Sequence, residues 1–205
     1  EDRIPLVNLV DGTGGTVTVG TVAEQLLYEV SDPQAYYVPD VVCDFSQVKL
    51  EQVGPDRVKV SGAKGYPPTA TYKVCVTYDE GWRSVALTPI IGIEAPAKAR
   101  RQAEAILRRT RKMLRDRNMA DWALTHVELL GAEAGYGARG RIADSREVIC
   151  KIVVEHEDPR ACELFWREQN SATMNMSVGT SIGLANATPR ALPVTKPFSF
   201  LIDKK

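Results

Sequence analysis

The pattern of apolar and polar residues changes at about residue 84. Before this point, short apolar runs alternate with loops rich in glycine, proline and threonine, and residues 21–30 repeat apolar positions at helical spacing. The apolar run at residues 4–10 predicts a buried strand. Two β-rich segments flank Gly54-Pro55-Asp56-Arg57, a sequence typical of a hairpin turn. We therefore expect residues 1–83 to be strand-rich, with one helix.

From residue 84 onward, strand and helix patterns follow one another regularly. Proline at position 96 is favourable at the start of a helix, and Asp158 with Pro159 opens another that fades near Asn170. The expected strands are 84–94, 122–131, 146–156 and 196–203, and residues 71–80 form a separate strand before them. The order β-α-β-β-α-β predicts a ferredoxin-like domain at residues 84–205 and an α/β chain of the mixed α+β kind.

Composition limits the class of protein. With 205 residues, of which 44% are hydrophobic, the chain is long enough to fill a core. Lysine plus arginine and aspartate plus glutamate both number 26, so no overall charge favours nucleic acid or an anionic membrane. No apolar stretch approaches the roughly 20 residues that span a bilayer, and no signal peptide is evident. We predict a soluble, cytoplasmic protein with no nucleic-acid or membrane partner.

Two further features concern the chain start and the cysteines. The sequence begins without methionine and enters an apolar segment at once, as a processed chain, a split-gene subunit or a truncated protein would. The cysteines lie in apolar runs and lack metal-ligand spacing, so we expect buried, reduced thiols at Cys43, Cys75, Cys150 and Cys162.

The helix predicted at residues 96–117 is strongly basic, with nine basic and two acidic residues. Such a helix could bind the phosphates of a nucleotide or acyl-CoA, or contact an acidic partner chain. It could also be a solvated face whose long side chains cover apolar surface. Nucleic-acid binding is disfavoured because aromatic residues do not interleave the basic ones.

A glycine-rich loop is the first candidate site. Residues 11–16 follow an apolar strand and precede a helix, so their amides could approach a phosphate or carboxylate closely. The candidate ligand-binding residues are Thr13, Gly14, Gly15 and Thr16. The loop matches neither of two common phosphate-binding motifs, GxxxxGK[ST] and GxGxxG. A tight turn that needs positive φ is the alternative.

The second group of candidates combines carboxylates with a lysine. Asp40 and Asp44 are four residues apart, a spacing that places both on one face of a strand, where they could act as acid and base or hold a divalent cation. Asp40 could equally form a turn after Pro39. Tyr72 and Lys73 enter a strand directly after a proline-rich loop, where Lys73 could reach a ligand or be an ordinary exposed lysine.

Other catalytic patterns are missing from the sequence. The two histidines, His126 and His156, lie in or beside strands without ligand-like spacing, so we predict no catalytic role for them. The sequence also lacks the GxSxG motif of many serine hydrolases, so it gives little support for a self-contained hydrolase.

Residues 12–83, from GTGG to EGWR, resemble the most recognisable stretch of the acyclic terpene utilisation (AtuA) family. Residues 146–165 resemble a segment near the end of that family's large domain, and the resemblance covers essentially the whole chain. It implies that residues 1–83 are the C-terminal part of an α/β core. The N-terminal half of that core is either a second chain in the native assembly, which we expect as a partner, or part of a longer protein from which this chain was cut. Val10-Asp11 departs from the His-Pro pair of the family at this position, so no histidine role is carried over.

The resemblance also implies a functional class. The family is associated with catabolism of terpenoids through acyl-CoA intermediates, so we expect a subunit or half of a catabolic enzyme acting on branched-chain acyl-CoA or carboxylate substrates. Asp40, Asp44 and Lys73 would be catalytic, and Tyr72 would bind ligand beside the glycine loop. Lyase or hydratase chemistry suits carboxylates better than redox chemistry, because no dinucleotide fingerprint is present. The resemblance fixes no cofactor. The alternative is a non-catalytic interaction or ligand-binding subunit of a larger complex.

Overall fold

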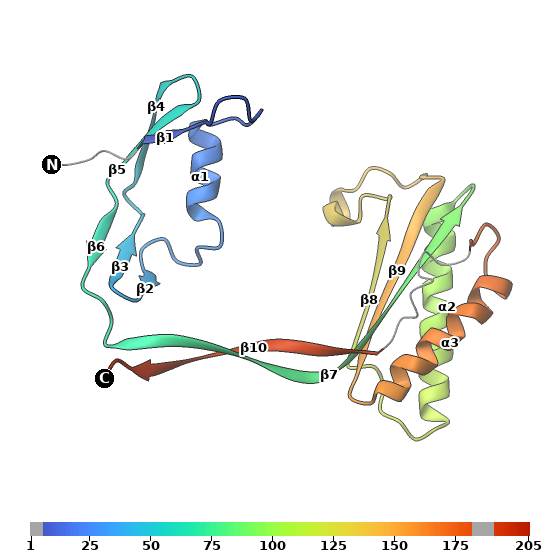
Figure 1. The fold of residues 1–205 in the computed structure, drawn as a ribbon. Coiled ribbons are helices and arrows are strands. Elements are labelled where there is room, and N and C mark those ends of the chain that lie inside the picture. Colours follow the sequence, from blue (N-terminus) through green and yellow to red (C-terminus); the bar gives the residue numbers. More distant parts are fainter. Residues whose placement is uncertain (1–5, 182–190) are drawn as a thin grey trace. The chain divides into compact units, whose positions relative to one another are not determined.

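The chain folds into two compact units that combine helices with antiparallel sheets (Figure 1). A computed structural model describes residues 6–181 and 191–205. Unit 1 consists of Glu1–Cys75 and Ser199–Lys205, and unit 2 consists of Val76–Phe198. The predicted mixed α+β class is confirmed.

Unit 1 is strand-rich and holds one helix, α1 (Val19–Leu27). Its strands form two three-stranded sheets, in the orders β1-β5-β4 and β2-β3-β6. The predicted hairpin is present, because β4 and β5 pair across Pro55 and Asp56, and Asp56 adopts a φ of 48°. The strand bounds are β1 Leu6–Asn8, β2 Tyr36–Val38, β3 Val41–Asp44, β4 Lys49–Gly54, β5 Arg57–Ser61 and β6 Lys64–Tyr66.

The prediction of a buried strand at residues 4–10 is wrong for its described part. All three residues of β1 are exposed, including Leu6 at 49%. β1 pairs only with β5, at the edge of its sheet. An apolar run thus identified a strand here, but it did not show whether any element covers that strand.

Unit 2 is built on a four-stranded sheet in the order β10-β7-β9-β8. Its elements follow the chain as strand, helix, strand, strand, helix and strand, with a short 3-10 helix, η1, before β9. The order of strands in the sheet and the order of elements along the chain both support the ferredoxin-like arrangement, which stays a prediction. The bounds are β7 Thr71–Ile91, α2 Ala95–Arg115, β8 Leu124–Leu130, η1 Ala134–Arg139, β9 Glu147–His156, α3 Pro159–Asn175 and β10 Leu192–Asp203.

The two strands expected at 71–80 and 84–94 are one strand, β7, and the predicted boundary after residue 83 falls inside it. Gly81 makes this continuity possible. Its φ is +78°, and an added Cβ would lie 3.0 Å from the carbonyl oxygen of His156 on β9. A glycine that looks like a strand end in the sequence instead permits close approach of the neighbouring backbone.

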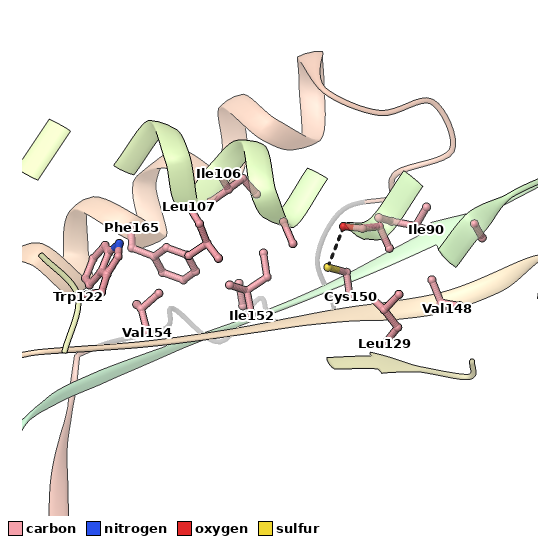
Figure 2. Packing of buried hydrophobic residues seen from close by; sticks show 14 of the residues in the cluster. Ile90, Ile106, Leu107, Trp122, Leu129, Val148, Cys150, Ile152, Val154 and Phe165 are labelled. Atoms are coloured by element: carbon pink, nitrogen blue, oxygen red, sulfur yellow. Dashed lines mark hydrogen bonds between the residues drawn. The ribbon is translucent and has the colours of Figure 1, made fainter. Parts of the chain in front are cut away.

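The core of unit 2 lies between the sheet and the helices α2 and α3, which pack against one face of the sheet (Figures 1 and 2). Alternate residues of β9 face the helices, as the strand period requires. Phe165 of α3 is fully buried and meets Trp122 edge to face, with ring centroids 6.0 Å apart. The other labelled core side chains are aliphatic, apart from Cys150: Ile90, Ile106, Leu107, Leu129, Val148, Ile152 and Val154.

The cysteine prediction is half right. Cys150 and Cys162 are buried, and burial raises the pKa of each thiol to about 11. Figure 2 shows the Cys150 Sγ donating to the Ala99 carbonyl oxygen at 3.6 Å. Cys43 on β3 is half-buried and Cys75 on β7 is exposed. None of the four cysteines is in a disulfide.

Candidate functional site

The glycine loop before α1 is a tight turn exposed to solvent. The Thr13 Oγ1 donates to the carbonyl oxygen of Val10 at 2.7 Å. Gly12 and Gly14 have φ values of +76° and +69°, which disfavour any residue with a side chain. At Gly15 an added Cβ would lie 2.8 Å from the Leu9 side chain. The tight-turn explanation therefore accounts for these glycines without a ligand.

The start of α1 is already occupied by groups of the chain itself. Thr18 and Thr21 form a reciprocal capping box. The amide of Val17 donates to the Asp56 carboxylate at 2.8 Å, and the amide of Val19 donates to the Gln52 side chain at 3.2 Å. A bound anion would meet the negative charge of Asp56. The helix start therefore favours anion binding less than its position suggested, and a role for Thr13–Thr16 stays a prediction.

Asp40 does not share a strand with Asp44, so the premise of a carboxylate pair on one strand face is wrong. Val38 pairs directly with Val41, and Pro39 and Asp40 form the two-residue turn between β2 and β3. The turn after Pro39 that the sequence left open is the one observed. Asp40 is exposed at this turn.

Asp44 ends β3, opposite Lys64 on β6. Its Oδ1 accepts a hydrogen bond from the amide of Ser46 at 2.9 Å. The Ser46 side chain and amide, followed by the attraction of Lys64, lower the pKa of the Asp44 carboxyl. Asp44 therefore stays ionised more readily than an ordinary aspartate. It is better suited to binding a cation or stabilising the local fold than to donating a proton.

Tyr72 and Lys73 lie at the exposed start of β7, and as strand neighbours they point to opposite faces. Lys204, near the chain end, connects Tyr72 with the Asp40 turn. Its Nζ lies 4.9 Å from the centre of the Tyr72 ring and donates to the Pro39 carbonyl oxygen at 2.5 Å. Its amide donates to the Ala70 carbonyl oxygen at 2.9 Å.

Lys204 thus brings together two of the predicted site regions, the Asp40 turn and Tyr72. The glycine loop lies apart from them, at the N-terminal end of α1, whereas β2 and β3 lie toward its C-terminal end (Figure 1). Sequence reasoning missed Lys204, because only the pairing of β10 with β7 returns the chain end to this place.

A second polar cluster lies on the face of the unit 2 sheet opposite the helices. His126 on β8 is exposed there, beside the ion pair between Lys151 and Glu128 (2.8 Å). The hydrogen bond from Lys151 is the main cause of the lowered pKa of Glu128, to which the nearby His126 adds. A shallow groove of about 490 Å³ runs here, lined by Arg83, Val85, Leu124, Thr125, His126, Lys151, Val153 and Glu155. Cross-strand pairing creates this cluster, so residue spacing along the chain gave no sign of it.

His156 has a structural role. It is buried, its Nε2 donates to the Ala120 carbonyl oxygen at 3.1 Å, and its Nδ1 accepts from the Asp158 amide at 2.9 Å. The Asp158 carboxylate pairs with Arg160, which lowers its pKa to about 2. These contacts fix the connection between β9 and α3.

Among residues 6–181 and 191–205, no group of three or more histidine, cysteine, aspartate or glutamate side chains is arranged to hold a metal ion. None of the described helices has the length and apolar character that crossing a membrane requires.

These features define a mixed α+β protein whose candidate ligand residues lie in its strand-rich unit. The model of the acyclic terpene utilisation family protein AtuA matches residues 5–205. The chain therefore belongs to the AtuA family, which confirms the resemblance seen in the sequence. No curated protein and no solved structure matches the chain.

Proposed function

We propose that this chain is part of a catabolic enzyme that acts on branched-chain, terpenoid acyl-CoA or carboxylate substrates by lyase or hydratase chemistry. Family membership supports a role in acyclic terpene utilisation. The observation that carries the proposal further is the contact of Lys204 with both the Asp40 turn and Tyr72. This contact joins an ammonium group, a phenol ring and the turn that carries Asp40, from three distant parts of the chain.

In this proposal Asp40 is the general base. It takes a proton from water as the water oxygen adds to the β-carbon of an unsaturated thioester, and the protonated Asp40 carboxyl then returns that proton to the α-carbon. Lys204, whose Nζ lies over the Tyr72 ring, stabilises the negative charge that develops on the thioester oxygen, and Lys73, which points to the opposite face of β7, adds a weaker attraction at longer range. An ammonium group has three donors, and one Lys204 donor is used by Pro39. Asp44 remains ionised and keeps β3 in place beside Lys64.

We further propose that a second protein chain covers unit 1 and completes the site. Among the described residues of unit 1, Val58 alone is buried. Many of its large apolar side chains are at least 37% exposed: Leu6, Val7, Val10, Val19, Leu27, Tyr28, Tyr36, Tyr37, Val53, Tyr66 and Tyr72. Apolar surface of this extent is typical of an interface.

The test is hydration of 3-methylcrotonyl-CoA by the protein isolated from its own cells with any chain that accompanies it. Asp40→Asn should lower kcat by about 100-fold or more, as loss of a general base does. Lys73→Ala and Lys204→Ala should lower kcat less. Glu51→Gln, an exposed change on β4, is the matched control. Full turnover in both Asp40→Asn and Lys73→Ala would remove these residues from the mechanism.

A ligand-binding subunit without catalysis is the second candidate. The exposure of Tyr72 and Lys73 and the lowered pKa of Asp44 favour it, because catalytic acid-base groups usually lie in water-excluded sites. This candidate predicts saturable binding of the same acyl-CoA with no turnover by the intact assembly. Weaker binding by Lys73→Ala and Lys204→Ala variants would show that the acyl-CoA binds at the candidate site. Unchanged binding by both variants would place it elsewhere.

A further inference from the structure

The outward face of α2 carries a straight row of three arginines, Arg101, Arg108 and Arg115, and this row goes beyond the proposed catalysis. All three are exposed. They lie opposite the buried stripe of the helix, which consists of Ala99, Ala103, Ile106, Thr110 and Leu114. Seven residues separate successive members, so they are about 10.5 Å apart and rotated by only about 20° from one another.

The row is left without ion-pair partners, whereas basic residues beside it are neutralised. Arg109 pairs with Glu168 at 2.5 Å, Arg111 with Asp121 at 3.2 Å, and Lys112 with Asp116 at 2.6 Å. Within the described residues, no salt bridge or hydrogen bond involves the side chains of the row. Arg115 contributes only a weak attraction to Asp116. The whole chain has a formal net charge of zero, so the row is a local excess of positive charge and not a property of the protein as a whole.

The row consists entirely of arginine. A guanidinium presents paired donors that match a carboxylate or phosphate in two parallel hydrogen bonds, which a lysine cannot do. A second copy of α2 does not fit, because the same face would bring like charges together. The remaining partners are an acidic protein surface, a nucleic acid and an anionic membrane.

Glu104 distinguishes between these partners. It lies on the same face as the row, between Arg101 and Arg108, and is exposed. A phosphate polyanion would be repelled there, whereas a protein helix can place a basic residue opposite Glu104. The neighbouring Ala97 offers little apolar surface for insertion into a membrane. A partner helix also repeats with the same period of about 10.5 Å per seven residues, so its carboxylates stay in register with the row.

We propose that Arg101, Arg108 and Arg115 form a docking surface for an acidic α-helix of another protein. That helix carries carboxylates at seven-residue spacing and a basic residue opposite Glu104. The two helices lie nearly parallel or antiparallel, as helices with such a repeat do.

The experiment uses two labelled, helix-stabilised peptides of the same composition and the full chain. One peptide carries glutamates at seven-residue spacing with a lysine placed to face Glu104, and its isomer distributes these residues around the helix. Fluorescence anisotropy should show binding of the first peptide at least about tenfold tighter, which corresponds to three surface pairs of ordinary strength. Equal binding of the two isomers would overturn the proposal.

Variants identify the surface and the class of partner. Arg101→Glu, Arg108→Glu and Arg115→Glu together should abolish the preference for the first peptide. The matched control, Arg139→Glu, Arg141→Glu and Arg146→Glu, makes the same charge change at three exposed positions elsewhere and should leave it unchanged. Glu104→Lys should weaken peptide binding. If Glu104→Lys instead leaves the peptide unaffected and strengthens binding to duplex DNA or to phosphatidylserine vesicles, the row serves a polyanion or a membrane and the proposal is wrong.

Discussion

The two units differ in what holds them together. Among the described residues, unit 2 has a continuous core of sixteen buried residues between its sheet and two helices, whereas Val58 is the one buried residue of unit 1. The candidate ligand residues all lie in unit 1. The chain therefore separates a packed scaffold from a more exposed unit that carries the proposed chemistry, and segments with few buried contacts are those that open most readily.

Unit 1 depends on hydrogen bonds where unit 2 depends on packing. The Gln52 Nε2 lies within bonding distance of three carbonyl oxygens, those of Val17, Gly54 and Arg57. Each such bond contributes about 0.5–1.5 kcal/mol net, because the same groups would otherwise bond to water. Full burial of one large apolar side chain contributes about 1.5–3 kcal/mol. We therefore expect the free energy of unfolding of unit 1 to be smaller than that of unit 2.

Thiol reactivity should show the largest difference between the units. Cys43 and Cys75 of unit 1 should react with an alkylating reagent at pH 8 faster than the buried Cys150 and Cys162. Only the thiolate reacts, and a pKa raised from 9.0 to about 11 lowers the thiolate population of Cys150 and Cys162 by about 100-fold. Mass spectrometry of peptides after timed labelling measures the four rates. Comparable rates at all four thiols would mean that the core of unit 2 opens as readily as unit 1.

The same burial gives a pH dependence. A thiol that titrates near 9.0 when unfolded and at about 11 when folded favours the folded state fully below pH 9. This contribution is lost as pH rises from 9 through 11, because the unfolded chain ionises first. The urea concentration that unfolds unit 2 should therefore decrease as pH rises across this range. Cys150→Ser is not a suitable control, because it also changes the packing of the core. Cys75→Ser, at an exposed position, is the suitable control.

Phe165→Ala should destabilise unit 2 by about 3–5 kcal/mol, as loss of a buried aromatic side chain usually does. All three tryptophans, Trp82, Trp122 and Trp166, lie in unit 2, so their emission during urea unfolding reports on that unit alone. The counterpart in unit 1 is Leu27→Ala, at a position that is 51% exposed, and it should shift the tryptophan transition by less than about 0.5 kcal/mol. Similar shifts for both variants would break the comparison.

Gly81→Ala should cost about 1–3 kcal/mol, because it places a side chain at positive φ against the His156 carbonyl. Tryptophan emission again reports the change. Gly135→Ala, also in unit 2, where an added Cβ would meet nothing within 4 Å, is a control of the same chemical type. If both variants are equally stable, Gly81 is not what keeps β7 continuous.

Local patterns explain which parts of the fold were predictable. The turn at Pro55 and Asp56 and the apolar stripe of α2 depend on residues close in sequence, and both are present. The continuity of β7 was missed, because the need for Gly81 comes from the carbonyl of His156, which is 75 residues away. Sequence reasoning also ended α3 near Asn170, whereas the helix runs to Asn175 through small and polar residues that carry no strong helical period.

The candidate site was harder to predict for the same reason. Asp40 and Asp44 were paired on the assumption that they share a strand, but the two-residue turn at Asp40 changes its position. Lys204 reaches Tyr72 only because β10 pairs with β7, and His126 reaches the Lys151 and Glu128 pair only across β8 and β9. Contacts between distant strands are set by register, which residue spacing along one segment does not encode.

The smallest predicted effect tests whether hydrogen bonds organise unit 1. Gln52→Ala removes the acceptor for the Val19 amide and the donor to the Val17 carbonyl, so it should destabilise the start of α1 by about 1–2 kcal/mol. Hydrogen exchange at the Val19 amide should accelerate by about tenfold, whereas β9 amides and the tryptophan unfolding transition should not change. Glu51→Ala, next to it on β4, removes only an exposed ion pair to Lys59 at 3.8 Å and serves as the control. If Gln52→Ala shifts the tryptophan transition as far as it shifts exchange in α1, the two units unfold together, and the stability of the scaffold extends to the unit that carries the candidate site.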